Sequence, residues 1–242
     1  MIQYSETLAK GYNEFHSRGN QSQKFQNYKI KHYLNLNHNS VLLDAGCGAG
    51  RLFGLSEMIG KMIGVEKSAD MYEQALKQPY EVEIYNQDYK DFLNQQTIKV
   101  DSVVFSYTLH QFDANKKNQI QILHDTFKKL GCKKILLITA SDNQFKESIL
   151  NQLSPQIDAI DRDRYLFKQE LLSEFRIPVY EEETIYKNIS RKDYKTLVEH
   201  KYISTLQLIT DVEFNNILQR IDQLPENLIL PDYYTYILLE QK

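Results

Sequence analysis

The sequence of 242 residues contains no tryptophan, only two cysteines and no long hydrophobic run. Cys47 and Cys132 stand far apart and form no CxxC or Cys/His cluster, so we expect a reducing compartment and no bound metal. The longest apolar runs, such as residues 134–140, fall well short of the ~20 residues that cross a bilayer. The first residues also lack a basic segment followed by an apolar one. We therefore predict a cytoplasmic protein without a membrane anchor.

The sequence has no excess of positive charge and no linker rich in proline, glycine or serine. Lys and Arg number 29 against 32 Asp and Glu, a formal net charge of −3, which removes the commonest electrostatic reason to expect a nucleic-acid partner. Hydrophobic residues make up 42% and charged residues 25%, as in ordinary globular proteins. The five prolines are scattered, and no repeat is present. We predict a single domain over residues 1–242.

Periodicity divides this domain into segments. Residues 1–36 are predicted to form a helical cap, because apolar and aromatic side chains recur there at helical spacing. Over residues 40–140, short apolar runs alternate with amphipathic stretches, as in βαβ units with a parallel sheet buried on both faces. The predicted strands are Val41–Leu43, Met62–Val65, Val82–Tyr85, Val103–Phe105 and Ile135–Ile138, and the helices between them include Ala69–Lys77 and Lys116–Leu130.

The alternation lapses after residue 140. Residues 141–176 are predicted to form a helical insertion, and residues 177–242 to form late strands and helices. The predicted late strands are Val179–Ile189 and Tyr233–Leu239, with helices over 191–223 between them. The pattern thus predicts an α/β fold with a doubly wound, mostly parallel sheet, to which the late pair can add an antiparallel strand.

The strongest motif is VLLDAGCGAG, residues 41–50. A predicted strand delivers Asp44, and Gly46, Gly48 and Gly50 follow at every second position. Glycines at the carboxyl end of a strand let the backbone approach a ligand closely, and ligands of doubly wound sheets bind there. The third glycine stands one place too early for the GxGxxG pattern of dinucleotide-binding proteins, where this chain has Arg51. The motif therefore predicts a ligand-binding loop that departs from the dinucleotide type.

Two further acidic residues follow predicted strands. Glu66 ends the second strand, where a carboxylate can accept hydrogen bonds from both hydroxyls of a ribose. Ser68 is placed to cap the next helix, and Met71 on that helix either lies against the ligand or belongs to the core. Asp88 follows the third strand, where its carboxylate can accept from an adenine amino group, with the backbone or ring of Tyr89 completing the pocket.

These motifs, taken together over residues 41–107, resemble class I S-adenosylmethionine-dependent methyltransferases. The resemblance covers D-x-G-x-G-x-G, then G-V-E-x-S-x-x-M, then the strand-end D-Y. It implies a Rossmann-like seven-stranded sheet with a final antiparallel strand, S-adenosyl-L-methionine as cofactor and S-adenosyl-L-homocysteine as product. It also implies a cofactor site, to which we assign Asp44, Ala45, Gly46, Cys47, Gly48, Glu66, Lys67, Met71, Asp88, Tyr89 and Ser106.

The segment FSYTLHQF, residues 105–112, follows the fourth strand, where the methyl group should point. It lacks the Asn/Asp-Pro-Pro-aromatic tetrapeptide of enzymes that methylate amino groups of bases. His110 in this segment is either a general base on the acceptor or a residue that shapes the pocket. Cys47 lies inside the glycine loop, where a backbone contact to the cofactor is favoured over nucleophilic catalysis.

The N-terminal segment folds over the cofactor in the enzymes that this chain resembles. Arg18 can then pair with the methionine carboxylate, and otherwise it is a solvated cation. Tyr12 either closes on the methyl group as a catalytic residue or is an ordinary helix residue. The charged run Asp161–Arg164 is predicted to be a turn whose charges compensate one another.

The predicted function is transfer of a methyl group, by in-line displacement, to a small-molecule acceptor. Methylation of RNA or protein on the same fold and a non-catalytic cofactor-binding subunit are the alternatives. A nicotinamide-dependent oxidoreductase is disfavoured by the glycine spacing. Fold does not fix the acceptor, and the sequence leaves the oligomeric state open.

Overall fold

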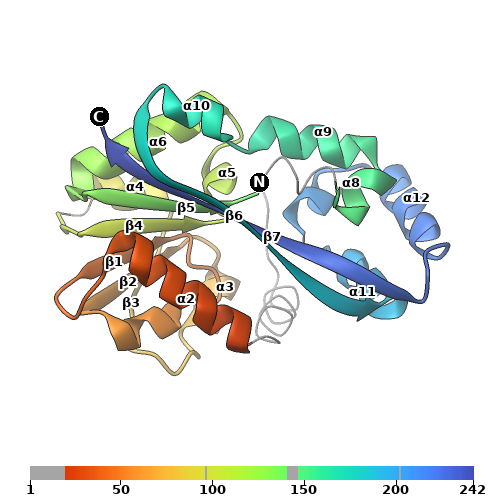
Figure 1. Cartoon of the computed structure of the whole chain (residues 1–242), viewed down its shortest axis with the longest axis horizontal. Helices are drawn as coiled ribbons and strands as arrows, with labels where there is room; N and C mark the ends of the chain where they lie inside the picture. The colour runs from red at the N-terminus through yellow and green to blue at the C-terminus, as the bar shows by residue number, and fades with distance from the viewer. Residues whose placement is uncertain (1–19, 96, 141–146, 202) are drawn as a thin grey trace.

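The structure is a computed structural model that describes residues 20–95, 97–140, 147–201 and 203–242 (Figure 1). Its centre is one seven-stranded sheet in the order β3-β2-β1-β4-β5-β7-β6. The strands are β1 (Val41–Ala45), β2 (Lys61–Glu66), β3 (Glu83–Asn86), β4 (Ser102–Ser106), β5 (Lys134–Thr139), β6 (Phe175–Ser190) and β7 (Asn227–Gln241).

Strands β1 to β5 run parallel, and β7 pairs antiparallel with both β5 and β6. This confirms the predicted α/β fold with a doubly wound, mostly parallel seven-stranded sheet. The strand order reverses between β1 and β4, because β2 and β3 lie on one side of β1 and the later strands on the other. A crevice forms at such a reversal beyond the carboxyl ends of the strands, and the ligand site is expected there.

Helices cover both faces of the sheet, as alternation along the buried strands requires. Leu42 of β1 packs in the core under α2 and η1, whereas its neighbour Leu43 packs in the core under α4 and α6. The helices are α2 (Asn20–Leu34), η1 (Phe53–Met58), α3 (Ala69–Ala75), α4 (Tyr89–Gln95), α5 (Leu109–Phe112), α6 (Lys116–Leu130), α8 (Ile149–Leu153), α9 (Pro155–Arg164), α10 (Lys168–Leu172), α11 (Arg191–Glu199), η2 (Ser204–Gln207) and α12 (Asp211–Ile221).

Local signals in the sequence fix the ends of two of these helices. The Ser68 side chain accepts a hydrogen bond from the Met71 amide at 3.4 Å, which confirms the predicted cap of α3. Helix α6 has the predicted bounds. Asn115 caps its start, and Gly131 ends it with a φ of 66°, a left-handed conformation that glycine adopts at little cost.

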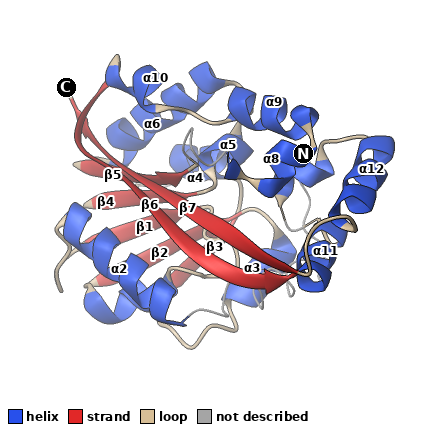
Figure 2. Ribbon diagram, turned by 45° about the vertical axis from the view of Figure 1, so that its right-hand side comes forward, coloured by secondary structure: helices blue, strands red, loops and turns tan. Residues whose placement is uncertain are grey.

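The late strands β6 and β7 are longer than predicted and form a hairpin that extends past the carboxyl edge of the sheet (Figure 2). Pairing of β7 with β5 ends at Thr235, so the hairpin continues from there as a two-stranded ribbon. The scattered prolines are expected at element boundaries, but Pro178 and Pro231 lie inside the two strands. Pro178 is tolerated beside a bulge on the edge strand β6, and Pro231 lies where β7 has lost its pairing with β5.

A third apolar cluster lies away from the sheet and joins the far end of the hairpin to α8, α9, α11 and α12. Its buried members include Leu150, Ile157, Val198, Ile217 and Leu228. These helices form a layer, here called the helical roof, on the side of the molecule to which the parallel strands point (Figures 1 and 2). No helix in the described part of the chain is long and apolar enough to cross a membrane.

The charged run Asp161–Arg164 is the last turn of α9, and the prediction of a mutually compensating turn is wrong. Arg162 points outward and pairs with Asp158 at 2.9 Å, whereas Asp161 and Arg164 are buried. Asp161 accepts hydrogen bonds from Thr205 at 2.5 Å and from Asn151 at 3.3 Å. Helical spacing explains the separation, because residues three apart share a face that residue 162 does not.

Candidate functional site

A cleft runs along the carboxyl ends of β1, β2, β3 and β4, at the reversal of strand order. It consists of two adjoining pockets that share Gly46, Glu66, Thr108 and Gln111 in their walls. One pocket adds Asp44, Cys47, Gly48, Ala49, Arg51, Leu52, Met71, Ser106 and Tyr107, and the other adds residues that include Lys67, Gln87, Asp88, Tyr89, His110, Arg164 and Leu208. The cleft therefore brings together the ends of four strands and the helical roof.

Asp44 lies at the floor of this cleft and is only 1% exposed. Its Oδ1 atom is buried and has no hydrogen-bond partner in the described part of the chain. Burial raises the pKa of Asp44 to about 7, which nearby Arg51 opposes and the Glu66 carboxylate reinforces. A buried acceptor of this kind is costly unless a donor satisfies it, which makes Asp44 a candidate acceptor for a ligand donor.

Glu66 ties the end of β2 to the glycine loop. One oxygen accepts from the Gly48 amide at 2.9 Å and the other from the Ser68 amide at 2.7 Å. Burial raises the pKa of this carboxyl, while these two amide donors pull the pKa in the opposite direction. Each carboxylate oxygen has a second lone pair, so Glu66 can hold the loop and still accept from ligand hydroxyls.

The glycine loop is shaped by close approach of neighbouring residues. A side chain at Gly46, where φ is 75°, would lie 2.8 Å from Thr108, whose hydroxyl donates to the Ala45 carbonyl at 2.7 Å. The amides of Gly46 and Cys47 both donate to the Val65 carbonyl, at 2.9 and 3.0 Å. These two amides are therefore occupied, and the predicted backbone contact of Cys47 would have to use another atom.

Both cysteines are poorly suited to nucleophilic catalysis. Burial, together with nearby Asp44, holds the pKa of the Cys47 thiol well above its usual range. Burial raises the pKa of Cys132 to about 12. Within the part of the chain that the structure describes, no group of three or more His, Cys, Asp and Glu residues could hold a metal ion.

Arg51 is the site residue that sequence reasoning missed. Its guanidinium donates to the Ser106 hydroxyl and to the Gln26 side chain of α2, and it lines the cleft beside Asp44. One usable signal was present in the sequence, because Arg51 directly follows the glycine loop that carries the ligand. The motif alone marks this residue only as a departure from the dinucleotide pattern.

The remaining predicted cofactor residues lie around the same cleft. Lys67 and Asp88 form an ion pair of 2.7 Å at its rim. Partial burial raises the pKa of Asp88, but hydrogen bonds from Lys67 and the Lys90 amide outweigh it and leave the pKa below its ordinary value. The Met71 side chain is buried in the cleft wall, and Ala45 lies beneath the loop at the end of β1.

Tyr89 is predicted to complete the pocket with its backbone or its ring, and the structure places the ring in the core, which favours the backbone. The Tyr89 ring is buried between Phe92 and Phe112, and its hydroxyl bonds to Thr126 in α6 at 2.9 Å. Tyr89 therefore lies in the wall of the cleft, and its ring is fixed in the core. Tyr12 and Arg18 lie outside the described residues, and their roles stay predictions.

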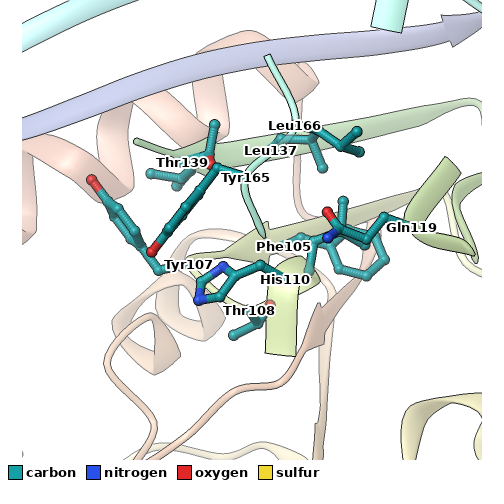
Figure 3. A pocket seen from close by; sticks show the side chains of 11 residues that line it. Phe105, Tyr107, Thr108, His110, Gln119, Leu137, Thr139, Tyr165 and Leu166 are labelled. Carbon is teal, nitrogen blue, oxygen red and sulfur yellow. The ribbon is translucent and has the colours of Figure 1, made fainter. Parts of the chain in front are cut away.

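His110 lies where β4 gives way to α5, in a small pocket between the sheet and the helical roof (Figure 3). Its ring packs on Tyr165 with centroids 4.2 Å apart, and Figure 3 shows it between Tyr165 and Thr108. Burial, with nearby Arg164, lowers the pKa of His110 to about 3. An imidazole that holds a proton this weakly is an inefficient base near neutral pH, so the geometry favours the pocket-shaping interpretation.

We expect His110 to stay neutral across the physiological range. In the NMR spectrum, its ring C–H signal should not move between pH 5 and 8, and loss of that signal in His110→Asn identifies it among the six histidines. Because the folded pKa lies below the ordinary value of 6.5, His110 lowers stability only as the pH falls from 6.5 toward 3. A signal that titrates near pH 6.5 would contradict this assignment.

Tyr107 adopts an uncommon backbone conformation at the same edge. Its φ is 56°, in the left-handed region, which costs a bulky residue about 1–3 kcal/mol. The conformation is held by a hydrogen bond from the Tyr107 amide to the Ile138 carbonyl at 2.8 Å and by one from its hydroxyl to the Tyr233 carbonyl of the hairpin. Strain of this kind is concentrated at functional sites. Here the two hydrogen bonds that hold Tyr107 connect the wall of the cleft to β5 and to the hairpin.

The charges of the cleft indicate the kind of ligand that fits. Asp44 and Glu66 contribute two carboxylates and Arg51 one guanidinium, so these groups leave an excess of negative charge when ionised. A ligand with an amino-acid head, a ribose and a second positive centre would match them, because Asp44 can accept from an ammonium, Glu66 from hydroxyls, and Arg51 can donate to a carboxylate. The two phosphates of a dinucleotide would instead meet two buried carboxylates.

The fold and this cleft resemble those of class I methyltransferases. Residues 42–131 match the family model of the methyltransferase domain. Similar solved structures include a candidate methyltransferase from Bacillus halodurans (14% identity, TM-score 0.56, covering 88% of this chain and 97% of that one) and a SAM-dependent methyltransferase from Archaeoglobus fulgidus (16%, 0.54, 95% and 99%). The plantazolicin methyltransferase BpumL, in complex with a triazolic desmethylPZN analog and SAH, is also similar (15%, 0.55, 98% and 90%). Among curated proteins, none matches the sequence of this chain.

Residues 42–131 accordingly form a methyltransferase domain on the class I fold, for which S-adenosylmethionine is the cofactor. The structural likenesses, all at low sequence identity, speak for the fold, and the family model matches the segment that forms the glycine loop and Glu66.

Proposed function

We propose that the protein methylates a small-molecule acceptor held between the carboxyl end of β4 and the helical roof. One observation carries this proposal: Arg164 of α9 and Leu208 beyond η2 line the same cleft as Gly46 and Glu66. The chain thus supplies its own cover over the acceptor side of the site. Enclosed clefts suit compact ligands, whereas a nucleic-acid duplex needs an open, basic surface.

The residues of the site have separable tasks in this proposal. S-adenosylmethionine supplies a methyl group that its sulfonium already activates. Asp44 would hold the ammonium, Glu66 the ribose hydroxyls, and Arg51 the carboxylate. Because the methyl donor is activated, the chain contributes mainly by orienting the two reactants and excluding water, which suits the roof.

The similarity to BpumL supports this acceptor class without identifying the acceptor. That structure holds a desmethylPZN analog. The structural match has a TM-score of 0.55 and covers 98% of this chain, including the roof. We propose that this chain takes a free, compact acceptor rather than a nucleic acid or a membrane lipid.

The cofactor assignment predicts a selective thermal shift. At a concentration a hundredfold above its Kd, S-adenosylhomocysteine stabilises the native state by about 2.7 kcal/mol, which raises the midpoint of a chain of this length by roughly 5–10 °C. NAD at the same concentration should leave the midpoint unchanged, because its phosphates lack partners in the cleft. A shift with NAD and none with S-adenosylhomocysteine would reverse the assignment.

The acceptor class is tested by methyl incorporation. Protein and methyl-labelled S-adenosylmethionine are incubated in parallel with a deproteinised small-metabolite extract, with total RNA and with a protein lysate. We expect label in a metabolite fraction, and none of it when Glu66→Gln replaces the wild type. Label confined to RNA or to protein would refute the small-molecule proposal while leaving the cofactor assignment intact.

A further inference from the structure

Arg164 is the last residue of α9 and lines the cleft. The side chain is only 6% exposed, and its Nη1 atom is buried without a hydrogen-bond partner in the described part of the chain. The residue is held in place by Gln119, whose amide donates to the Arg164 carbonyl at 2.7 Å and to the Asp113 carbonyl at 2.9 Å. Arg164 is therefore fixed at the cleft wall rather than extended into solvent.

Two of the three carboxylates of the same helix are engaged elsewhere, and the third, that of Asp163, is exposed. Asp161 is near enough to interact electrostatically with Arg164, but its oxygens are bonded to Thr205 and Asn151. Asp158 pairs with Arg162. No ion pair joins Arg164 to any described acidic residue. Buried guanidinium groups are ordinarily paired, because an unpaired one loses its hydration and gains no interaction that offsets the loss. The burial of Arg164 therefore points to an anionic partner from outside the chain.

His110 adds a second unsatisfied group to the same cleft wall. Its Nε2 atom is buried without a partner among the described residues, and its ring is 5% exposed. His110 and Arg164 line one pocket together, and they interact electrostatically. Figure 3 shows that the His110 ring is confined by Tyr165 and Thr108, so its nitrogens keep a fixed direction. The Arg164 guanidinium and the His110 imidazole are thus two fixed polar groups that one ligand can satisfy together.

We infer that the acceptor carries a carboxylate that binds Arg164 beside His110. The inference rests on the proposed function and narrows its substrate class. A planar guanidinium matches the two oxygens of a carboxylate, and a single positive charge matches a single negative one. The nearby apolar surfaces of Phe112, Tyr165 and Leu208 suit an aromatic or apolar body attached to that group.

The test compares matched acids and amides as ligands. Protein saturated with S-adenosylhomocysteine is titrated with benzoate and benzamide, and with 3-phenylpropanoate and 3-phenylpropanamide, and binding is followed by ligand-observed NMR. We expect each acid to bind at least tenfold more tightly than its amide. Arg164→Met should abolish this preference, and Arg164→Lys should retain part of it. Arg162→Met, which removes the outward-facing arginine of the same helix, is the matched control and should bind like the wild type.

Stability of the ligand-free protein separates this role from a structural one. Arg164→Met removes a buried unpaired charge and should keep or raise the thermal midpoint, whereas a structural arginine would lower it. Equal binding of acid and amide by the wild type, or a preference that survives in Arg164→Met, would overturn the inference. So would a loss of S-adenosylhomocysteine affinity in Arg164→Met alone, because that result would assign the residue to the cofactor. Failure of the wild type itself to bind S-adenosylhomocysteine would instead defeat the function on which the inference rests.

Discussion

Asp44→Asn should make the ligand-free protein more stable at pH 8 and make it bind S-adenosylhomocysteine much less tightly. The folded structure raises the pKa of Asp44 from 3.8 to about 7, because burial disfavours the ionised form. A raised carboxyl pKa means that ionisation favours the unfolded chain. With 1.36 kcal/mol for each pKa unit, the cost at pH 8 is about 4 kcal/mol as an upper bound. A neutral asparagine side chain at this position would carry no such cost.

The pH dependence of this effect follows from the same two pKa values. Below pH 3.8 the carboxyl is protonated in both states and the variant gains nothing from its loss of charge. The gain grows between pH 4 and 7 and is constant above the folded pKa. Denaturant unfolding of wild type and variant across this range measures it directly. Asp91→Asn, at an exposed position on α4, is the control and should show no such trend.

Binding should change in the opposite direction. A ligand ammonium that loses its charged acceptor loses about 1.5–3 kcal/mol, or roughly 10- to 150-fold in affinity. Calorimetric titration with S-adenosylhomocysteine gives this number. A variant that is less stable than the wild type at pH 8 would show that the ionised Asp44 carboxylate does not destabilise the folded protein. Unchanged affinity would remove Asp44 from the cofactor site.

The part of the fold from β1 to β5, which carries the glycine loop, could be predicted because the sequence signals for it are local. Apolar runs bounded by helices define β1 to β5, and three alternating glycines after Asp44 admit few conformations other than a close-approach loop. Ser68 and Gly131 mark helix ends by chemistry that acts within a turn. Each of these inferences depends on residues that lie near one another in the sequence.

The side of the cleft that faces the helical roof could not be predicted, because it depends on contacts between distant segments. The DRDR run gives no sign that Arg164 faces the cleft, since that follows from where the hairpin places the roof. Nor does the composition of β6 and β7 show that these strands extend beyond the carboxyl edge of the parallel sheet. That length is set by pairing of Asn227 with Ser190 far beyond the last residue of β5. His110 was identified as a candidate, but its burial and neutral state depend on Tyr165 and Arg164, more than fifty positions away.

Glu66→Gln should weaken both cofactor binding and the fold, whereas Asp44→Asn should weaken cofactor binding alone. Each oxygen of Glu66 accepts from a backbone amide, at Gly48 and at Ser68. Glutamine has the same shape but only one acceptor oxygen, so its amide nitrogen must face one of these N–H groups or a ribose hydroxyl. One buried donor loses its partner, which costs about 1–3 kcal/mol of stability.

The loss of affinity should exceed the loss of stability. Two ribose hydroxyls donate to this carboxylate in the proposed complex, and each bond to a charged acceptor contributes about 1.5–3 kcal/mol. We therefore expect S-adenosylhomocysteine to bind at least 100-fold more weakly to Glu66→Gln in calorimetric titration. Glu57→Gln, on the exposed side of η1, is the matched control and should leave both quantities unchanged. If Glu66→Gln lowers the thermal midpoint but keeps its affinity, Glu66 serves only to tie the glycine loop to α3, and the ribose must find its acceptor elsewhere in the cleft.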